Sequence, residues 1–550
     1  MSVTKMRKVI SIARVFLAPT LALFLADAAH AAVPGITGPT FNLTAQTAFL
    51  NQPDGNQVYS WGYGCNGTPS GTAPGAITTA TCPTMQVPGP TLIVTEGQTV
   101  TVSLTNGLPP AAGNTSILFP GFNVTATGGV PGLLTQEAAH NATVTYSFVA
   151  NSPGTHAYYS GTQSDLQVEM GMYGAVIVLP NAVPTACSSG LPVTHPGNNA
   201  AAKTHWGESD FRLAPAAFDH ARSCYDREYL FQWAEMDPRI HTTALAQVTA
   251  LSTCTAGTPT CKLEVPTEPY HPGYFVINGR SMPDLMDANF APEYPHQPYN
   301  GNPHMHPGEM VLIRSIGQGR WQHPFHEHAN HVRILARDGN MILSSDNTDL
   351  AGSLMFNTDT TPGEAFDGIF YFSGRGLNWD PYGHNPNSTD PNAKLGCTPD
   401  VNGYNTAAPN DINYFEWCQD HNKPVEANPI GDVPGGGPVT LPNPNILTNG
   451  PWYGGTPYLG PDATLRGGGN QACLYNNSGA STITQTSPGT SVCSSLQPSN
   501  IQANPANERG WAYMWHSHNE REITTNNVFP GGMLMMMLVD SREFVIDETN

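Results

Sequence analysis

Short runs of apolar and β-branched residues, each closed by glycine, proline or asparagine, recur along most of this chain. Strands at such short spacing are typical of a β-sandwich or barrel. One set predicts strands at residues 57–61, 91–95, 99–105, 143–149, 156–159 and 173–179. A second set predicts strands at 229–233, 274–277, 309–316, 331–336, 365–372, 511–515 and 533–539. The pattern therefore predicts an all-β protein with domains at 33–180 and 204–540, joined by a linker at 181–203.

The second set is interrupted between about residues 374 and 509 by a tract rich in Asn, Pro, Gly and Thr. A loop of this length without structure of its own is improbable inside a compact domain. We expect one loop-rich insertion that forms a partly structured cap or an independent lobe.

The first 31 residues have the pattern of a secretory signal peptide. Four basic residues precede an apolar run at 15–26 and the small-residue segment Ala29-His30-Ala31. The run is shorter than a membrane span of roughly 20 residues, and no later segment reaches that length. We therefore expect cleavage after Ala31, export to the periplasm or out of the cell, and no membrane span.

Composition and charge narrow the class further. The chain has 55 glycines and 50 prolines, which break helices but suit short strands joined by turns. Disorder is the alternative, and the 20 Tyr, 20 Phe and 9 Trp argue against it because they can build a core. A formal net charge of −20 disfavours nucleic acid as a partner.

Ten cysteines fall into neighbouring couples, which indicates five local disulfides in an oxidising compartment. Metal binding is the alternative for any couple, although no CxxC spacing occurs. The expected pairs are Cys65 with Cys82, Cys187 with Cys224, Cys254 with Cys261, Cys397 with Cys418, and Cys473 with Cys493.

Histidines are concentrated at two places, His323-Pro-Phe-His-Glu-His and Trp515-His-Ser-His. Side chains at i and i+2 of a strand share a face, so His326 is expected to point with His328, and His516 with His518. On neighbouring strands these pairs would offer four imidazoles to one volume. Imidazole suits copper, zinc, iron and nickel, and the alternative is that these are structural histidines bonded to carbonyls.

These two motifs resemble the multicopper oxidase family, whose proteins are chains of cupredoxin domains. The likeness also runs through Val87-Pro-Gly-Pro-Thr-Leu-Ile-Val, Met172-Tyr-Gly-Ala-Val-Ile-Val, Val276-Ile-Asn-Gly, Arg337-Asp-Gly and Gly531-Gly-Met. The resemblance implies two cupredoxin-like Greek-key β-sandwich domains, copper as the cofactor and an oxidoreductase activity.

The resemblance also implies roles for individual residues. His326, His328, His516 and His518 would belong to the type 2 and type 3 copper cluster, and His323 would be a type 1 ligand. Ser517 stands where the family has the type 1 cysteine, Glu522 replaces a second histidine, and Met533 stands near the axial methionine. The first domain has Leu118-Phe-Pro-Gly and Tyr159-Ser-Gly in place of histidine motifs. We therefore expect one or two copper ions, no blue site, and at most a weaker second metal position at His323 and Glu522.

Other candidates have simpler explanations. His304 and His306 form one more same-face pair, but they precede a Pro-Gly turn. Met533, Met535 and Met537 alternate along a strand, which is first a core pattern. Glu520 and Glu522 could orient imidazoles, ligate metal directly or lie in a solvated turn.

Together these features predict an exported copper-binding oxidoreductase with a reduced copper set, oxidising a small molecule or a metal ion. The alternative is a non-catalytic protein that sequesters copper or serves as an extracellular scaffold. The sequence identifies neither substrate nor catalytic residues, and homo-oligomer formation stays open.

Overall fold

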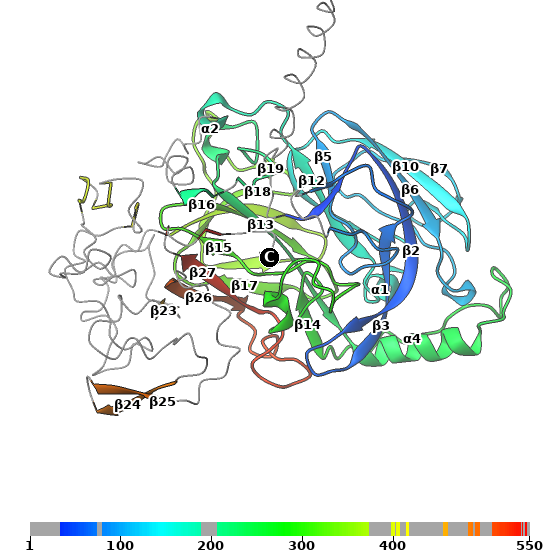
Figure 1. Ribbon diagram of the computed structural model, residues 1–550. Coiled ribbons are helices and arrows are strands. Elements are labelled where there is room, and N and C mark those ends of the chain that lie inside the picture. Colours follow the sequence, from blue (N-terminus) through cyan, green and yellow to red (C-terminus); the bar gives the residue numbers. More distant parts are fainter. Residues whose placement is uncertain are drawn as a thin grey trace, which may run out of the picture.

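The computed structural model shows two β-sandwiches that lie side by side (Figure 1). It describes residues 33–73, 80–188, 206–208, 210–372, 398–401, 403–406, 414–416, 455–459, 482–487, 490–494, 509–540, 542 and 545–546, with the backbone alone for 188, 455–459, 482–487, 490–494, 509 and 510. The expected signal peptide, much of the expected linker and most of the expected insertion lie outside the described residues.

The first sandwich consists of two five-stranded sheets, with strand orders β11-β12-β5-β1-β4 and β3-β2-β6-β10-β7. Buried and partly exposed side chains alternate along β6 and β10, as expected for strands with one face on a core. The main strands are β1 (Gly35–Thr37), β2 (Thr40–Asn51), β3 (Gln57–Cys65), β4 (Thr72–Ala73), β5 (Leu92–Thr95), β6 (Thr99–Asn106), β7 (Thr125–Gly128), β10 (Thr143–Val149), β11 (Gly154–Tyr159) and β12 (Tyr173–Leu179). A small hairpin adds β8 (Val130–Pro131) and β9 (Gln136–Glu137), and the helices are η1 (Pro110–Ala112) and α1 (Ser164–Gln167).

The second sandwich has one sheet in the order β14-β13-β16-β22-β18-β19 and another in the order β15-β27-β26-β17-β21. The first comprises β13 (Arg227–Met236), β14 (Tyr274–Ile277), β16 (Met310–Gly317), β18 (Val332–Arg337), β19 (Asn340–Met341) and β22 (Ala365–Tyr371), with β20 (Leu354–Met355) beside β18. The second comprises β15 (His304–Met305), β17 (His323–Glu327), β21 (Asn357–Thr360), β26 (Arg509–Ser517) and β27 (Leu534–Asp540), with β23 (Gly455–Leu459) beside β26. Between the sheets, the ring centroids of Trp233 and Phe325 lie 4.6 Å apart, and those of Phe325 and Trp515 5.9 Å apart.

Two apolar clusters join the sandwiches. In one, Val87 and Tyr173 of the first sandwich pack with Val276 of the second. In the other, Ile177 packs with Ile316. Strand β12 is therefore buried along almost its whole length.

Every predicted strand overlaps an observed one, and the predicted all-β class with two β-sandwiches is confirmed. The exact domain bounds stay a prediction. Strand β2 was missed because its Thr, Asn and Gln residues interrupt the apolar alternation.

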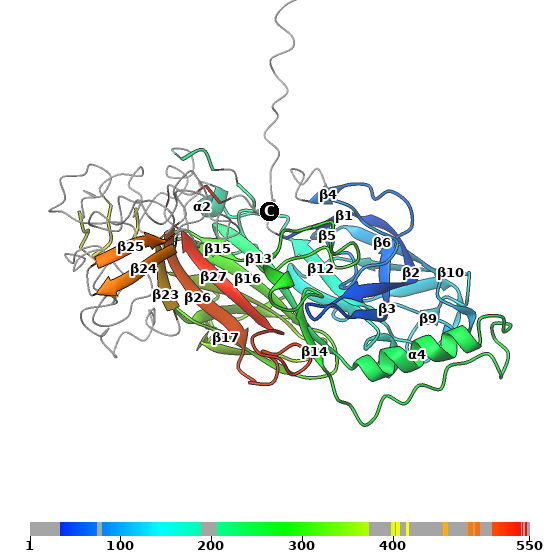
Figure 2. The same cartoon turned by 60° about the horizontal axis from the view of Figure 1, so that its bottom comes forward.

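The prediction also missed α4 (Pro238–Ala250), a 13-residue helix. Asp237 caps it by accepting from Arg239 N at 3.0 Å, and Pro238 occupies the first turn, so a start signal was present. The buried side chains of Ile240 and Ala244 join the core of the first sandwich, so a helix that follows β13 of the second sandwich covers the first (Figure 2). No helix in the described part of the chain is long and apolar enough to cross a bilayer.

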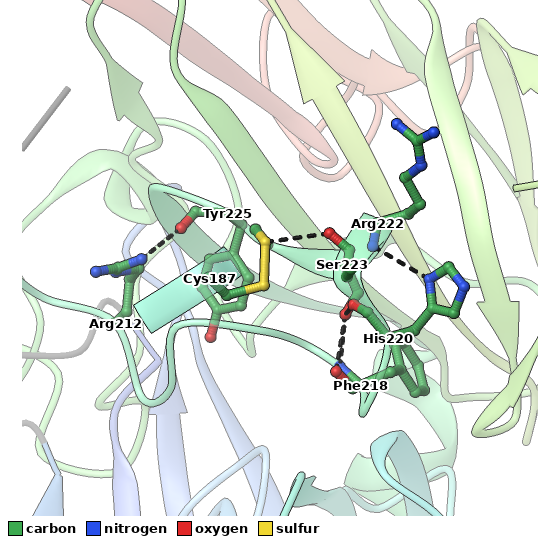
Figure 3. Close-up of a disulfide and its surroundings, with 9 residues drawn as sticks. Cys187, Arg212, Phe218, His220, Arg222, Ser223 and Tyr225 are labelled. Carbon is green, nitrogen blue, oxygen red and sulfur yellow. Dashed lines mark hydrogen bonds between the residues drawn. A yellow bond between two sulfur atoms is a disulfide. The ribbon is translucent and has the colours of Figure 1, made fainter. Parts of the chain in front are cut away.

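Shorter helices are α2 (Thr185–Ser188), η2 (Ala221–Ser223) and η3 (Asp284–Met286), and a separate hairpin consists of β24 (Thr482–Ser487) and β25 (Thr490–Ser494). The bond between Cys187 and Cys224 ties α2, within the expected linker, to the chain that enters β13 (Figure 3). Hydrogen bonds hold the turn before Cys224: Ser223 Oγ donates to Phe218 O at 2.9 Å, and Arg222 N donates to His220 Nδ1 at 3.1 Å.

Three predicted disulfides are confirmed: Cys65–Cys82, Cys187–Cys224 and Cys254–Cys261. The side chains of the other two expected pairs lie outside the described residues, so those pairs stay a prediction.

Candidate metal centre

Strands β17 and β26 are antiparallel neighbours and bring the two histidine motifs together. In their register His326 lies opposite His516, and Phe325 lies opposite Ser517. His328 and His518 follow the strand ends, where their backbone N–H groups donate to Met514 O at 3.3 Å and Pro324 O at 2.8 Å. The fold therefore places the two histidine pairs on neighbouring strands, as a shared site requires.

The four side chains form one group, which we call the histidine cluster: His326, His328, His516 and His518. The ring centroid of His326 lies 4.5 Å from that of His328, 5.4 Å from His516 and 4.9 Å from His518. His326, His328 and His516 are half-buried, whereas His518 is exposed. The cluster is thus open to solvent on one side.

Carbonyl groups orient two of these rings. Nδ1 of His326 lies 2.5 Å from Phe356 O, and Nδ1 of His516 lies 2.7 Å from Ser517 O. A carbonyl can only accept, so each Nδ1 carries the proton and each Nε2 keeps a lone pair. The Nε2 atoms of His328 and His516 lie 3.1 Å apart. Ring nitrogens of His326, His328 and His516 all lie within 4.8 Å of one another.

The surroundings keep these imidazoles neutral. Burial and then the neighbouring His328 lower the pKa of His326 to about 4, and burial lowers the pKa of His516. Neutral imidazole is the form that binds metal. Three convergent imidazoles at a site open to solvent fit a copper ion. His518 lies beside His326 and could be a further ligand. Within the part of the chain that the structure describes, no other group of three His, Cys, Asp or Glu residues brings its ligand atoms so close.

The positions that resemble type 1 ligands converge on the core side of the same strands. His323 Nδ1 donates to Glu522 Oε2 at 2.9 Å, and Ser517 Oγ donates to the same oxygen at 2.5 Å. On the other edge of the ring, His323 Nε2 donates to Glu235 Oε2 at 2.8 Å. We call Glu235, His323 and Glu522 the core-side triad. With both hydrogen bonds in place, His323 has no lone pair for a metal, and the hydroxyl of Ser517 is not the soft thiolate that a blue copper requires.

The core-side triad is almost completely buried. The side chains of Glu235 and His323 are 0% exposed, and that of Glu522 is 1% exposed. Burial alone would lower the pKa of His323, but its hydrogen bonds to Glu235 and Glu522 outweigh this and raise the pKa to about 9. His323 is therefore an imidazolium at neutral pH.

Sequence reasoning identified His323 and Glu522 but missed Glu235. The available signal was a carboxylate at the end of the apolar run Tyr229-Leu-Phe-Gln-Trp-Ala-Glu-Met, since a charge on a buried strand needs a partner. It also missed Tyr270, whose hydroxyl lies 3.1 Å from Glu235 Oε1.

The lesser histidine candidates have protein partners. His304 Nδ1 lies 2.7 Å from Asp540 Oδ2. His306 contacts Glu208 Oε2 through Nε2 at 2.6 Å and Asp540 O through Nδ1 at 3.0 Å. These contacts favour a structural role for the pair.

The methionine motif and the two glutamates after the second histidine pair differ in burial. Met533, Met535 and Met537 are 0% exposed and belong to the core between the sheets. Glu520 is exposed, whereas Glu522 is buried.

The first domain pairs the two segments that stand in place of histidine motifs. Leu118 and Tyr159 form a β-bridge, with Leu118 N donating to Tyr159 O at 2.8 Å. The segments therefore have the relative position that the resemblance implies, but they carry Leu, Phe, Tyr and Ser where the family has histidines.

Comparison with known proteins supports the family assignment. A multicopper oxidase family model matches residues 72–183. Copper resistance protein A of Escherichia coli is 38% identical over 93 residues, which are 17% of this chain and 14% of that protein. Multicopper oxidase MCE of Talaromyces pinophilus is 34% identical over 98 residues, 17% of this chain and 15% of that protein. The match thus spans less than a sixth of either relative.

Among solved structures, the blue copper oxidase from Nitrosomonas europaea is similar over 91% of this chain and 85% of its own, with 13% identity and a TM-score of 0.41. The family model matches the first domain, whereas the histidine cluster lies in the second. The predicted resemblance is nevertheless confirmed by the family model, and copper is the cofactor of that family. Residues 72–183 are therefore similar to the multicopper oxidase family.

Proposed function

We propose that this chain is an exported copper-binding oxidoreductase whose copper lies at His326, His328, His516 and His518, without a blue copper site. The observation that carries the proposal is the convergence of three imidazole nitrogens within 4.8 Å on two paired strands. Copper held there would supply one-electron transfer. Export is supported by the three disulfides and by the signal-like first 31 residues.

The chain's own residues would bind the copper ion and orient its histidine ligands. The carbonyls of Phe356 and Ser517 hold the rings of His326 and His516 so that Nε2 is free for a metal. Because the cluster is half-exposed, a small-molecule or metal-ion reductant could reach it from solvent without a relay through the protein. Such direct access would be needed, since Ser517 cannot conduct electrons as a thiolate does.

A second candidate function is copper sequestration without turnover. It is favoured by the same serine, which removes the family's route for electrons into the cluster, and by the lack of histidines at Leu118 and Tyr159. Measured turnover separates the two functions.

The test uses the purified mature chain, loaded with Cu(II) and dialysed. Copper content is measured, followed by oxidation of a methoxyphenol, Mn(II), Fe(II) or Cu(I). Oxidation that increases in proportion to bound copper supports the oxidoreductase, and stoichiometric copper without oxidation supports sequestration. No bound copper would contradict both. His271→Ala, which changes an exposed histidine outside the cluster, is the matched control.

The copper-loaded protein should contain fewer than four copper ions per chain and lack intense blue colour. The reason is that the charge-transfer absorption of blue copper needs a thiolate, and Ser517 supplies a hydroxyl. Elemental analysis and a visible spectrum check this. Ser517→Cys alone should stay colourless, because Glu522 still occupies the place of a histidine. An intense blue colour in the unmodified copper-loaded protein would contradict the prediction.

Copper loading should persist below pH 6.5, where unperturbed histidines begin to take up protons. Burial and neighbouring imidazoles lower the pKa of His326 to about 4, so protons compete with copper for this ligand only near that pH. Copper affinity is measured by competition with a chelator at pH 7, 6 and 5. A loss of about tenfold per pH unit for each ligand, beginning at pH 6.5, would show instead that the imidazoles titrate normally.

A further inference from the structure

We propose that Glu235, His323 and Glu522 form a metal-free ionic cross-link at the position where the family binds type 1 copper, holding β13, β17 and the chain between β26 and β27 together. This inference goes beyond the proposed function, since it does not depend on whether the histidine cluster binds copper. It replaces the weaker metal position expected at His323 and Glu522.

The geometry of the ring argues against a metal. Glu522 and Glu235 accept from different nitrogens of His323, at 2.9 Å and 2.8 Å, so they lie on opposite edges of the imidazole. An ion at Nδ1 would have to displace the proton that Glu522 accepts, and beside that nitrogen it would find Glu522 and the hydroxyl of Ser517, which is a poor copper ligand. A proton on each nitrogen satisfies both carboxylates at once.

The remaining oxygen atoms of both carboxylates are also satisfied. Glu522 accepts from Ser517 Oγ at 2.5 Å and, through Oε1, from Asn519 Nδ2 at 2.8 Å. Together with His323, these two neutral donors satisfy both oxygen atoms of Glu522. The hydroxyl that stands in the cysteine position is thereby part of the cross-link.

Glu235 has an equally complete set of donors. Its Oε1 accepts from the backbone N–H groups of Arg320 at 2.8 Å and Trp321 at 2.9 Å. The hydroxyl of Tyr270 lies 3.1 Å from the same oxygen, but it is closer to Glu169 Oε2, at 2.6 Å. Gly319, with φ of +69°, brings the chain over this carboxylate, and a Cβ there would lie 2.6 Å from Oε2. The segment before β17 therefore closes around the carboxyl group of Glu235.

Buried ionic groups are stabilising only when every charge is paired and hydrogen-bonded, and removal of one member is strongly destabilising. In the core-side triad, where each side chain is 0–1% exposed, the one positive charge of His323 contacts both carboxylates, and neutral donors satisfy their other oxygen atoms. The core-side triad links three segments directly behind the histidine cluster, because His323 and His326 lie on one strand and Ser517 lies between His516 and His518. The fold can therefore hold these strands in register without a metal.

The first test uses the metal-free, full mature chain labelled with ¹⁵N-histidine. At pH 7 the spectrum should contain a histidine signal with both ring nitrogens protonated that is lost in His323→Gln. A neutral His323, with one unprotonated nitrogen, would overturn the proposal. If the variant does not fold, the spectrum of the unmodified protein still shows whether a histidine carries protons on both ring nitrogens.

The second test compares melting temperatures of metal-free Glu522→Gln, Glu235→Gln and Glu520→Gln. The first two should melt on the order of 5–10 °C lower, as expected when one partner of a buried ion pair is removed. Glu520→Gln changes an exposed neighbour and should melt like the unmodified chain. Equal melting temperatures for all three would contradict a cross-link.

The third test asks whether a metal binds at the core-side triad. In the background His326→Ala with His516→Ala, Cu(II) or Zn(II) retained after dialysis should be absent. Retention of one ion per chain that is lost on adding Glu522→Gln would establish a metal site and overturn the proposal. Failure of the histidine cluster to bind copper in the unmodified chain would contradict the proposed function alone, leaving the first two tests to decide the cross-link.

Discussion

Replacing His326 and His516 together by alanine should lower copper affinity by at least about 100-fold, more than the loss typical of removing a supporting partner. These residues lie opposite each other on β17 and β26, and each supplies one of the three nitrogens that converge within 4.8 Å. The double variant removes two of these three nitrogens. We expect the remaining His328 and His518 to be too few ligands to hold copper tightly.

The measurement is copper content after dialysis, with affinity from chelator competition. Replacing His328 and His518 instead should remove the same copper, because the cluster is one site. His271→Ala should retain it, and the melting temperature of each metal-free variant shows whether the fold is intact. If both double variants keep their copper, the histidine cluster is structural and the proposed function is wrong.

Arg314→Met should lower the free energy of unfolding by about 3–5 kcal/mol, the usual consequence of removing one partner of a buried ionic network. The guanidinium is 0% exposed and donates to Glu228 Oε2 at 2.8 Å and to Asp367 Oδ1 at 3.2 Å. Asp367 also accepts from Thr155 Oγ1 at 2.6 Å, so the network joins the second sandwich to β11 of the first. Methionine fills a similar volume but leaves two carboxylates buried without a cation.

Chemical denaturation of the metal-free chain measures this change. Lys262→Met is the matched control, because its partner Glu264 is exposed and such surface pairs contribute little. An Arg314→Met variant as stable as this control would show that the two carboxylates take up protons or find other donors, and that the network does not hold the sandwiches together.

Local patterns were enough to predict the strands and the pairing of the histidines within each motif. Strand positions follow from the alternation of apolar and polar residues, which depends only on neighbours in the chain. The same two-residue period places His326 with His328 and His516 with His518, and it places His323 on the opposite face. The helix α4 was missed because the high glycine and proline content outweighed one Asp-Pro start signal in the prediction.

Long-range contacts decided what the local patterns could not. Glu235 lies 88 residues from His323, and Glu522 lies 199 residues from it, yet both contact its ring. No local period connects such positions. A histidine, a serine and a glutamate at the type 1 positions were visible in the sequence, but their use as hydrogen-bond partners depends on the second carboxylate that β13 supplies.

By itself, the sequence determined the all-β class, the candidate ligands and the missing thiolate, because each depends on residue type and short spacing. Only the tertiary structure decided that β17 and β26 are neighbours, that three imidazole nitrogens converge, and that His323 lies between two carboxylates. The physical reason is that strand pairing and burial are set by contacts between distant segments. Those contacts determine which side of a histidine meets solvent and which meets a charge.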